Sequence, residues 1–132
     1  MRIDRLELFL CRLPLVHFFE TSFGRSYDRE FILARVEGEG HEGWGEAVAE
    51  GFSFNNGETT ETVWHIVTRF LAPLVLGREF VHPREVYPAM KRVRTHNMAK
   101  ALLEMASWDL YATIQGKPLS AVLGGTQSLH TN

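Results

Sequence analysis

Six histidines, one cysteine and a small set of acidic residues are the side chains of this sequence that could take part in catalysis or metal binding. No two histidines stand four residues apart, the spacing that places two metal ligands on one helix face. Cys11 lies in a predicted strand without a base beside it, which is typical of a small buried hydrophobic residue. The sequence also contains no nucleophile elbow, phosphate-binding loop or dinucleotide-binding glycine motif. We therefore expect no catalytic residue and no metal site in this chain.

Among the acidic residues, Glu46 in a predicted strand and Glu104 and Asp109 in a predicted helix are the candidates for acid–base chemistry. Five residues separate the two helical acids, which turns their side chains about 140° apart around the helix axis. They therefore cannot act as one carboxylate pair. We interpret all three as acceptors of hydrogen bonds from backbone or arginine groups, with proton transfer as the less favoured alternative.

Two segments that are predicted to be loops, 15–28 and 51–57, are unusually rich in phenylalanine. Loops run over the surface, and exposed aromatic side chains usually mark a binding site or an interface. The segments therefore predict an apolar lid over a ligand, with Arg25 or Asn55 offering a polar contact to an acidic ligand. Packing over the edge of the sheet is an equally weighted alternative. The residues concerned are Phe18, Phe19, Phe23, Phe52 and Phe54, and His17 is the histidine that we favour as a further contact.

The strands that must position these segments follow from alternating hydrophobic residues. Residues 3–13 predict a strand that Pro14 ends, and residues 30–36 and 43–49 predict two more. Because a glycine-rich turn at 37–40 joins the last two, we expect a three-stranded antiparallel meander.

After the second phenylalanine-rich segment the hydrophobic pattern changes to helical spacing. Glu58 and Glu61 suit the positive end of the first helix. The first predicted helix has an apolar stripe over 63–74, with Thr59 or Thr60 as its N-cap and Pro73 as its end. A short helix opened by Pro83 follows. The last two predicted elements are a helix over 97–115 that Gly116 ends and an apolar turn over 119–123. Strands followed by three to four helices are typical of an α+β fold.

Length and composition agree with one domain and exclude several classes of protein. The 132 residues, 45% of them hydrophobic, can form one core, whereas a complete (β/α)8 barrel needs about 250 residues. A net charge of -2 does not favour nucleic acid or an anionic membrane as a partner. No apolar run reaches the roughly 18 residues of a membrane span, and the N-terminus does not lead into a signal-peptide core. We expect a soluble, cytoplasmic protein.

Several motifs in the second half of the chain resemble the end of the N-terminal capping domain of the enolase superfamily. They are the helix segment 98–110 with the downstream residues 116–119 and 123–125. The Gly-Trp-Gly-Glu sequence at 43–46 is similar to that of the muconate-lactonizing and mandelate-racemase-like branch. Within that branch, residues 14–24 and the start of the helix segment are most similar to o-succinylbenzoate synthases and N-acylamino acid racemases.

This resemblance implies an enolase-like capping domain over 1–125, with 126–132 as the start of a linker to a (β/α)8 barrel that this chain lacks. In the family the barrel binds Mg²⁺ through three acidic residues and carries two lysines that move a proton α to a carboxylate. Dehydration follows in the synthases, whereas the proton returns to either face in the racemases. The resemblance therefore implies no cofactor in this chain and Mg²⁺ in the full-length enzyme.

The resemblance also implies that two mobile loops of the capping domain, here about 17–27 and 50–58, close over the mouth of the barrel. Phe19 and Phe23 match aromatic positions of the first loop, and Phe52 and Phe54 fall in the second, where family members vary. Such loops exclude water and select substrate shape without transferring protons. The expected substrate-contact residues are therefore Phe19, Phe23, Phe52, Phe54, His17 and Arg25.

We expect a fragment or truncated product of such an enzyme, inactive by itself, whose partners are a small carboxylate substrate and its own barrel domain. Exposed apolar surface at the docking face of the barrel predicts homo-oligomers. The alternative is a standalone, non-catalytic module that binds a partner or itself through its aromatic loops. The sequence does not decide between dehydration and racemisation.

Overall fold

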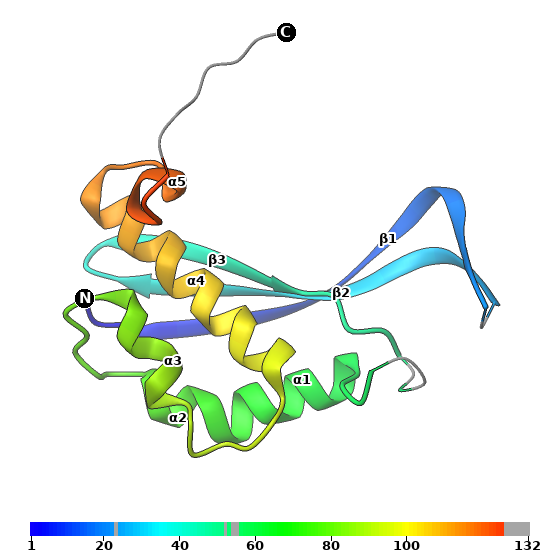
Figure 1. The fold of residues 1–132 in the computed structure, drawn as a ribbon, viewed down its shortest axis with the longest axis horizontal. Coiled ribbons are helices and arrows are strands. Elements are labelled where there is room, and N and C mark those ends of the chain that lie inside the picture. Colours follow the sequence, from blue (N-terminus) through cyan, green and yellow to red (C-terminus); the bar gives the residue numbers. More distant parts are fainter. Residues whose placement is uncertain (23, 52, 54–55, 126–132) are drawn as a thin grey trace, which may run out of the picture.

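The computed structural model describes residues 1–22, 24–51, 53 and 56–125 of the chain. A three-stranded antiparallel sheet in the order β1-β2-β3 comes first and the helices follow, which confirms the expected α+β fold (Figure 1). The elements are β1 (Arg5–Thr21), β2 (Gly24–Gly38), β3 (His41–Ala47), α1 (Thr60–Ile66), a π-helical turn (Val67–Leu71), α2 (Ala72–Val75), a 3-10 turn (Pro83–Glu85), α3 (Val86–Ala89), α4 (Asn97–Gln115) and α5 (Leu119–Val122). None of the described helices is long and apolar enough to cross a membrane. The expected linker, 126–132, lies outside the described residues.

The first two strands are longer than the sequence predicts. β1 continues through Pro14 to Thr21 and β2 begins at Gly24, so the prediction of a loop over 15–28 is wrong. β1 is an edge strand, where a residue without an N–H is tolerated, and the pairing with β2 shifts register between Pro14 and Phe19. The distal halves of these strands, residues 12–22 and 24–30, form a hairpin arm that projects beyond the helices (Figure 1).

The first helix begins as predicted but does not end at Pro73. Thr59 is its N-cap, and its side chain accepts a hydrogen bond from the N–H of Thr62. A π-helical turn then interrupts the α-helical hydrogen bonds, and Pro73 falls in the first turn of α2. The helical backbone runs through the π turn into α2, where the N–H of Ala72 donates to the carbonyl oxygen of Val67, so Pro73 leaves one hydrogen bond unmade without ending the helical run. The π turn also changes the helical phase, so Phe70 is half exposed although it belongs to the predicted apolar stripe.

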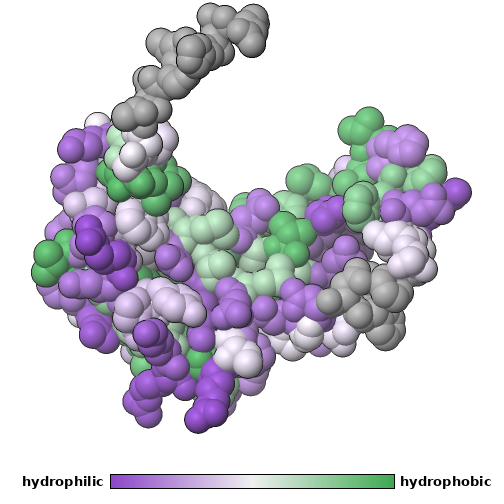
Figure 2. All heavy atoms as spheres, in the orientation of Figure 1, coloured by the Kyte–Doolittle hydropathy of each residue, from purple (hydrophilic) through white to green (hydrophobic). Residues whose placement is uncertain are grey.

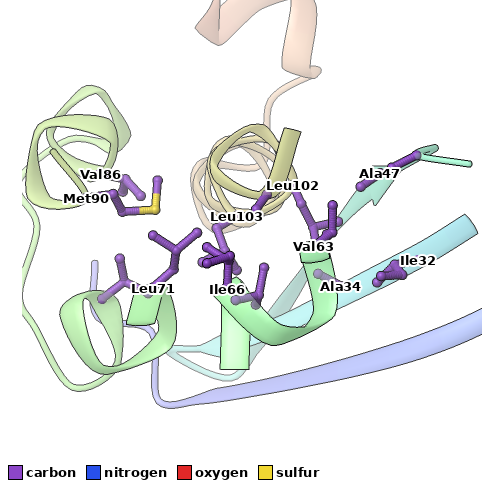
Figure 3. Close-up of a cluster of buried hydrophobic side chains, with 14 of the residues drawn as sticks. Ile32, Ala34, Ala47, Val63, Ile66, Leu71, Val86, Met90, Leu102 and Leu103 are labelled. Atoms are coloured by element: carbon purple, nitrogen blue, oxygen red, sulfur yellow. The ribbon is translucent and has the colours of Figure 1, made fainter. Parts of the chain in front are cut away.

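The main hydrophobic core lies between the inner face of the sheet and the helices (Figure 3). Ile32 from β2, Val63 from α1, Leu71 from the π turn and Leu102 from α4 meet there, and all four are almost completely buried. The predicted strand alternation and the predicted helix over 97–115 are both confirmed by this packing.

The backbone of α4 lies directly on two glycines of β3. A Cβ atom on Gly43 would overlap the carbonyl oxygen of Ala106, and one on Gly45 would overlap the carbonyl oxygen of Leu102. Alternate residues of a strand share one face, so the glycine spacing at 43 and 45 places both beneath the helix. The Trp44 side chain between them lies on the opposite face of the sheet.

Trp44 also explains the role of one predicted acidic residue. Its backbone N–H, on the free edge of β3, donates a hydrogen bond of 2.8 Å to the Asp109 carboxylate of α4. This confirms the interpretation of Asp109 as an acceptor at a packing surface. Glu46 and Glu104, by contrast, make no hydrogen bond to any described residue, contrary to the expectation for these two.

We expect Gly45→Ala to lower the free energy of unfolding by about 3 kcal/mol, because the added methyl group forces α4 away from the sheet. Gly57→Ala is the matched control, since no atom lies within 4 Å of the added Cβ, and we expect a change below about 0.5 kcal/mol. Urea unfolding followed by tryptophan fluorescence measures both values. Equal stabilities of the two variants would contradict the close packing of α4 on β3.

Candidate functional site

The first candidate segment is the tip of the hairpin arm. Phe19 pairs with Ser26 and Glu20 with Arg25 in the ladder between β1 and β2, so the expected first loop is largely strand. Phe19 is 48% exposed although it belongs to a regular strand. The arm therefore presents an aromatic side chain to solvent from a hydrogen-bonded hairpin. Phe23, the second aromatic residue predicted for this segment, lies outside the described residues.

Aromatic and charged side chains pack against one another along the arm. The His17 and Phe18 rings lie 4.4 Å apart between centroids, and His17 Nδ1 is 2.9 Å from the carbonyl oxygen of Phe18. The Arg25 guanidinium lies 4.2 Å from the centroid of the Phe18 ring, and its Nε donates to Glu20 at 3.3 Å. An incoming carboxylate that binds Arg25 would therefore compete with Glu20 for this cation.

The second candidate segment is the connection between β3 and α1. Phe52, Phe54 and Asn55, which the sequence nominates as contacts, lie outside the described residues. The described end of the connection is fixed by Asn56, whose amide oxygen accepts the N–H of Glu58 at 3.0 Å and whose amide nitrogen lies 2.9 Å from the Met98 sulfur. The connection is thus attached to the first turn of α4.

Glu58 makes the strongest part of this attachment. Its carboxylate accepts the N–H of Met98 at 3.0 and 2.9 Å, once through each oxygen, and the N–H of Ala99 at 3.1 Å. His96, the N-cap residue of α4, has φ 55° and ψ 48° and offers no side-chain hydrogen bond. An anionic acceptor is favoured at this helix N-terminus because first-turn N–H groups lack partners and the helix dipole is positive there.

The sequence analysis missed this role, because it placed Glu58 at the positive end of the helix that follows directly in the chain. The carboxylate instead caps a helix that begins 39 residues later, at Asn97. The one signal in the sequence is that His96 is a poor N-cap residue, so the helix over 97–115 needs an acceptor from elsewhere.

The two candidate segments lie side by side. They line one shallow pocket of about 210 Å³. Its lining residues are Arg12, Ser26, Asp28, Arg29 and Glu30 from the hairpin arm and Glu50 and Gly51 from the β3–α1 connection. Arg12 pairs there with Glu30 at 3.1 Å and with Asp28 at 3.8 Å. The hydrogen bond with Glu30 and the charges of both acids raise the pKa of the Arg12 guanidinium above its ordinary value.

These features define what the site can do chemically. Phe19 is not part of the pocket lining, and its exposed ring can contact an apolar part of a ligand from another position on the arm. Within the described ranges, no three His, Cys, Asp or Glu side chains gather closely enough to hold a metal ion. The arrangement fits ligand enclosure and selection of ligand shape.

Comparisons with known proteins agree on one family. Residues 7–124 match the model of the N-terminal domain of mandelate racemase and muconate lactonizing enzymes. The chain is 46% identical over 110 residues to an o-succinylbenzoate synthase of Geobacillus kaustophilus, a match that covers 83% of this chain and 29% of that protein. It is 42% identical over 127 residues to an N-succinylamino acid racemase of Thermus thermophilus, covering 96% of this chain and 34% of that protein.

The structural comparison gives the same result. A solved enolase superfamily protein of Enterococcus faecalis superposes with a TM-score of 0.87 and 39% sequence identity. The superposition covers 96% of this chain and 35% of that chain. The chain therefore spans about a third of the length of the relatives that it matches.

We expect Glu58→Ala to lower the free energy of unfolding by about 2 kcal/mol, because the N–H groups of Met98 and Ala99 lose their carboxylate acceptor. Glu58→Gln, which keeps an acceptor without the charge, should lose about half as much. Glu61→Ala is the control, since this exposed acid lies in the first turn of α1 without a hydrogen bond to a described residue. Hydrogen exchange at the Met98 and Ala99 amides is the local measurement, and unchanged protection in Glu58→Ala would contradict this role.

Proposed function

Because this chain belongs to the N-terminal domain family of mandelate racemase and muconate lactonizing enzymes, within the enolase superfamily, we propose that it is the substrate-capping and specificity domain of an o-succinylbenzoate synthase or N-acylamino acid racemase-like enzyme. The proposal is supported by the meeting of the hairpin arm and the β3–α1 connection at one polar pocket, and by the exposed Phe19 that the same arm presents outside that pocket. These are the two segments that a capping domain uses to cover a substrate.

In this proposal the chemistry belongs to a second domain of a longer protein. That domain removes a proton α to the carboxylate of the substrate, and dehydration or racemisation follows. The family uses Mg²⁺ for this reaction, but the described residues of this chain do not fit a metal site, since they hold no cluster of three ligating side chains. The proposal places the metal ligands, the acid and the base in the second domain.

The part proposed for this chain is to enclose the substrate. Phe19 supplies an apolar surface at the arm tip, and closure over a substrate would remove part of this ring and the apolar part of the substrate from water. His17 and Arg25 lie against Phe18, and the register pairs Arg25 with Glu20, which places Arg25 on the opposite face of the arm from Phe19. Phe23, Phe52 and Phe54 complete the set of proposed contacts. Such a surface selects substrates by their shape. This agrees with the different substrates in the names of the relatives, o-succinylbenzoate synthase and N-succinylamino acid racemase.

A standalone module that binds a partner or a second copy is the second candidate function. Large hydrophobic side chains that are exposed at the surface favour it, among them Trp44, Met105 and Leu123. The sequence of the gene beyond codon 132 distinguishes the two functions. An open reading frame that continues beyond codon 132 into a barrel-like sequence supports the capping domain, whereas a stop codon supports the standalone module.

In the complete gene product, we expect Phe19→Ala to raise the KM for the preferred substrate about tenfold, which corresponds to about 1.4 kcal/mol of lost binding. The change in kcat should be smaller, because the ring contacts the substrate without transferring a proton. Val16→Ala is the control, since Val16 is a fully exposed residue of the same arm. Steady-state kinetics of o-succinylbenzoate formation and of N-succinylamino acid racemisation measure both variants, and identical kinetics for the two would contradict the contact.

We expect the 132-residue chain alone to exchange no α proton of these substrates with deuterium oxide, because the proposal places the acid and base in the second domain. Proton NMR of the substrate after incubation with the purified chain is the measurement. Exchange of the α proton that Phe19→Ala abolishes would contradict the placement of the acid and base in the second domain.

A further inference from the structure

Arg29 is the one arginine of the described hairpin arm that has no carboxylate partner. Arg12 and Arg25 both form ion pairs with acids of the same arm. Arg29 is half-buried and forms no ion pair or hydrogen bond within the described ranges of the chain. A charge that is partly removed from water is stabilised by an opposite charge nearby. The Arg29 guanidinium is therefore available for an acid that the arm itself does not supply.

The same guanidinium lies beside Phe19, the proposed substrate contact. Its central carbon is 5.4 Å from the centroid of the Phe19 ring, which is within the range of a cation–π interaction. In the ladder between β1 and β2, Arg29 pairs on the base side of the register shift and Phe19 pairs on the tip side. A strand pair bends at such a shift, because part of its ladder is missing there. The contact with Arg29 thus joins the ring at the tip to the base of the arm.

Glu50 is the acid that meets this arginine from the β3–α1 connection. Arg29 and Glu50 line the same pocket of about 210 Å³, and the Glu50 side chain also has no partner among the described residues. The Glu50 backbone is held in place, since its carbonyl oxygen accepts the N–H of Thr60 at 3.2 Å. The Thr60 hydroxyl also donates to the carbonyl oxygen of Ala49. One wall of the pocket is therefore anchored on α1, whereas the other belongs to the arm.

The charges of this pocket suit an arginine better than they suit a substrate carboxylate. The lining contains two arginines and three acids, and two of those acids, Asp28 and Glu30, pair with Arg12. An incoming carboxylate would meet an excess of negative charge, whereas a cation is attracted. Arg29 is the cation that already lies in the lining, and Glu50 is the acid that remains for it.

The shape of the molecule lets the two walls approach each other. The arm projects beyond the helices, and hydrophobic and hydrophilic residues lie next to one another on its surface (Figures 1 and 2). A projecting hairpin with an interrupted ladder has few contacts that oppose bending. Movement of the arm toward the connection would bring Arg29 to Glu50 and would carry Phe19 with it.

We propose that Arg29 is the positioning residue of Phe19, and that it forms an ion pair with Glu50 when a substrate is bound against the Phe19 ring. This proposal rests on the proposed function, because it requires that Phe19 contacts the substrate. The polar pocket is then the junction between the arm and the β3–α1 connection, and the substrate lies outside it, on the ring that Arg29 holds.

A double-mutant cycle in the complete gene product tests the positioning role. We expect Arg29→Met, which removes the charge but keeps an apolar side chain, to raise the KM for the preferred substrate about fivefold, with a smaller change in kcat. Arg29→Lys keeps a cation and should raise the KM only about twofold. In a Phe19→Ala background, Arg29→Met should change the KM by less than about twofold, because the ring that it positions is absent. Equal effects of Arg29→Met in the two backgrounds would overturn the positioning role.

Exchange of the two charges tests the ion pair in the same protein. Arg29→Glu and Glu50→Arg each place like charges across the pocket, and we expect each to raise the KM about tenfold. The double variant should have a KM about threefold lower than either single variant. This recovery is partial, because a carboxylate does not replace the cation beside the Phe19 ring.

The controls for the exchange are Arg69→Glu and Glu61→Arg, which reverse exposed charges outside the pocket lining. We expect each control to change the KM by less than about twofold. If a charge-reversed variant does not fold, Arg29→Met and Glu50→Gln give the same cycle with neutral side chains. A double variant with no recovery, or additive effects in the neutral cycle, would overturn the ion pair.

NMR of this chain separates the proposal from the proposed function. The Nε–H signal of Arg29 is assigned by its loss in Arg29→Lys, and we expect Phe19→Leu to move it, because the ring current of Phe19 is removed. An unmoved signal would overturn the contact. A moved signal, with neither reaction in the complete product, would support the contact and contradict the assigned reaction. An active enzyme without coupling between Arg29 and Phe19 would overturn this proposal and support the assigned reaction.

Discussion

The direct contact between the α4 backbone and the two glycines of β3 is the constraint on which the rest of this domain depends. With no side chain at Gly43 or Gly45, the helix approaches the sheet at backbone distance. Because α4 lies so close to β3, the Asp109 carboxylate accepts a hydrogen bond from the Trp44 N–H on the free edge of this strand. The same contact sets the direction of a helix of 19 residues, and thus where its two ends lie.

Those two ends serve different purposes. At the N-terminus, the unpaired N–H groups of Met98 and Ala99 receive Glu58 and so attach the β3–α1 connection to the helical body. At the C-terminus, Gly116 adopts a left-handed conformation with φ 64°, which ends α4 and directs the chain into α5. One helix therefore links the β3–α1 connection at its N-terminus to α5 beyond its C-terminus.

The outer face of the sheet divides into a charged half and an apolar half. In the charged half, Arg35 pairs with Glu42 at 2.6 Å and with Glu37 at 2.8 Å, and the hydrogen bond with Glu42 raises the pKa of the guanidinium. In the apolar half, Phe9 stacks on Trp44 with 5.9 Å between ring centroids. Trp44 joins the two halves, because its indole N–H donates to Glu42 at 3.4 Å and the Arg35 guanidinium lies 6.0 Å from the centroid of its ring. Surface ion pairs of this kind add little stability.

The sequence by itself determined the class of fold, the meander, the first helix with its cap at Thr59 and the helix over 97–115, because these depend on local periodicity and capping. It also nominated the aromatic arm, although it predicted a loop where Pro14 is tolerated within an edge strand. Only the tertiary structure decided that Glu58 caps α4, that Glu46 and Glu104 stay unpaired within the described chain, and that the arm and the β3–α1 connection share one pocket. These features join residues far apart in the chain, and local spacing carries no information about which distant groups the packing of a helix on a sheet brings together.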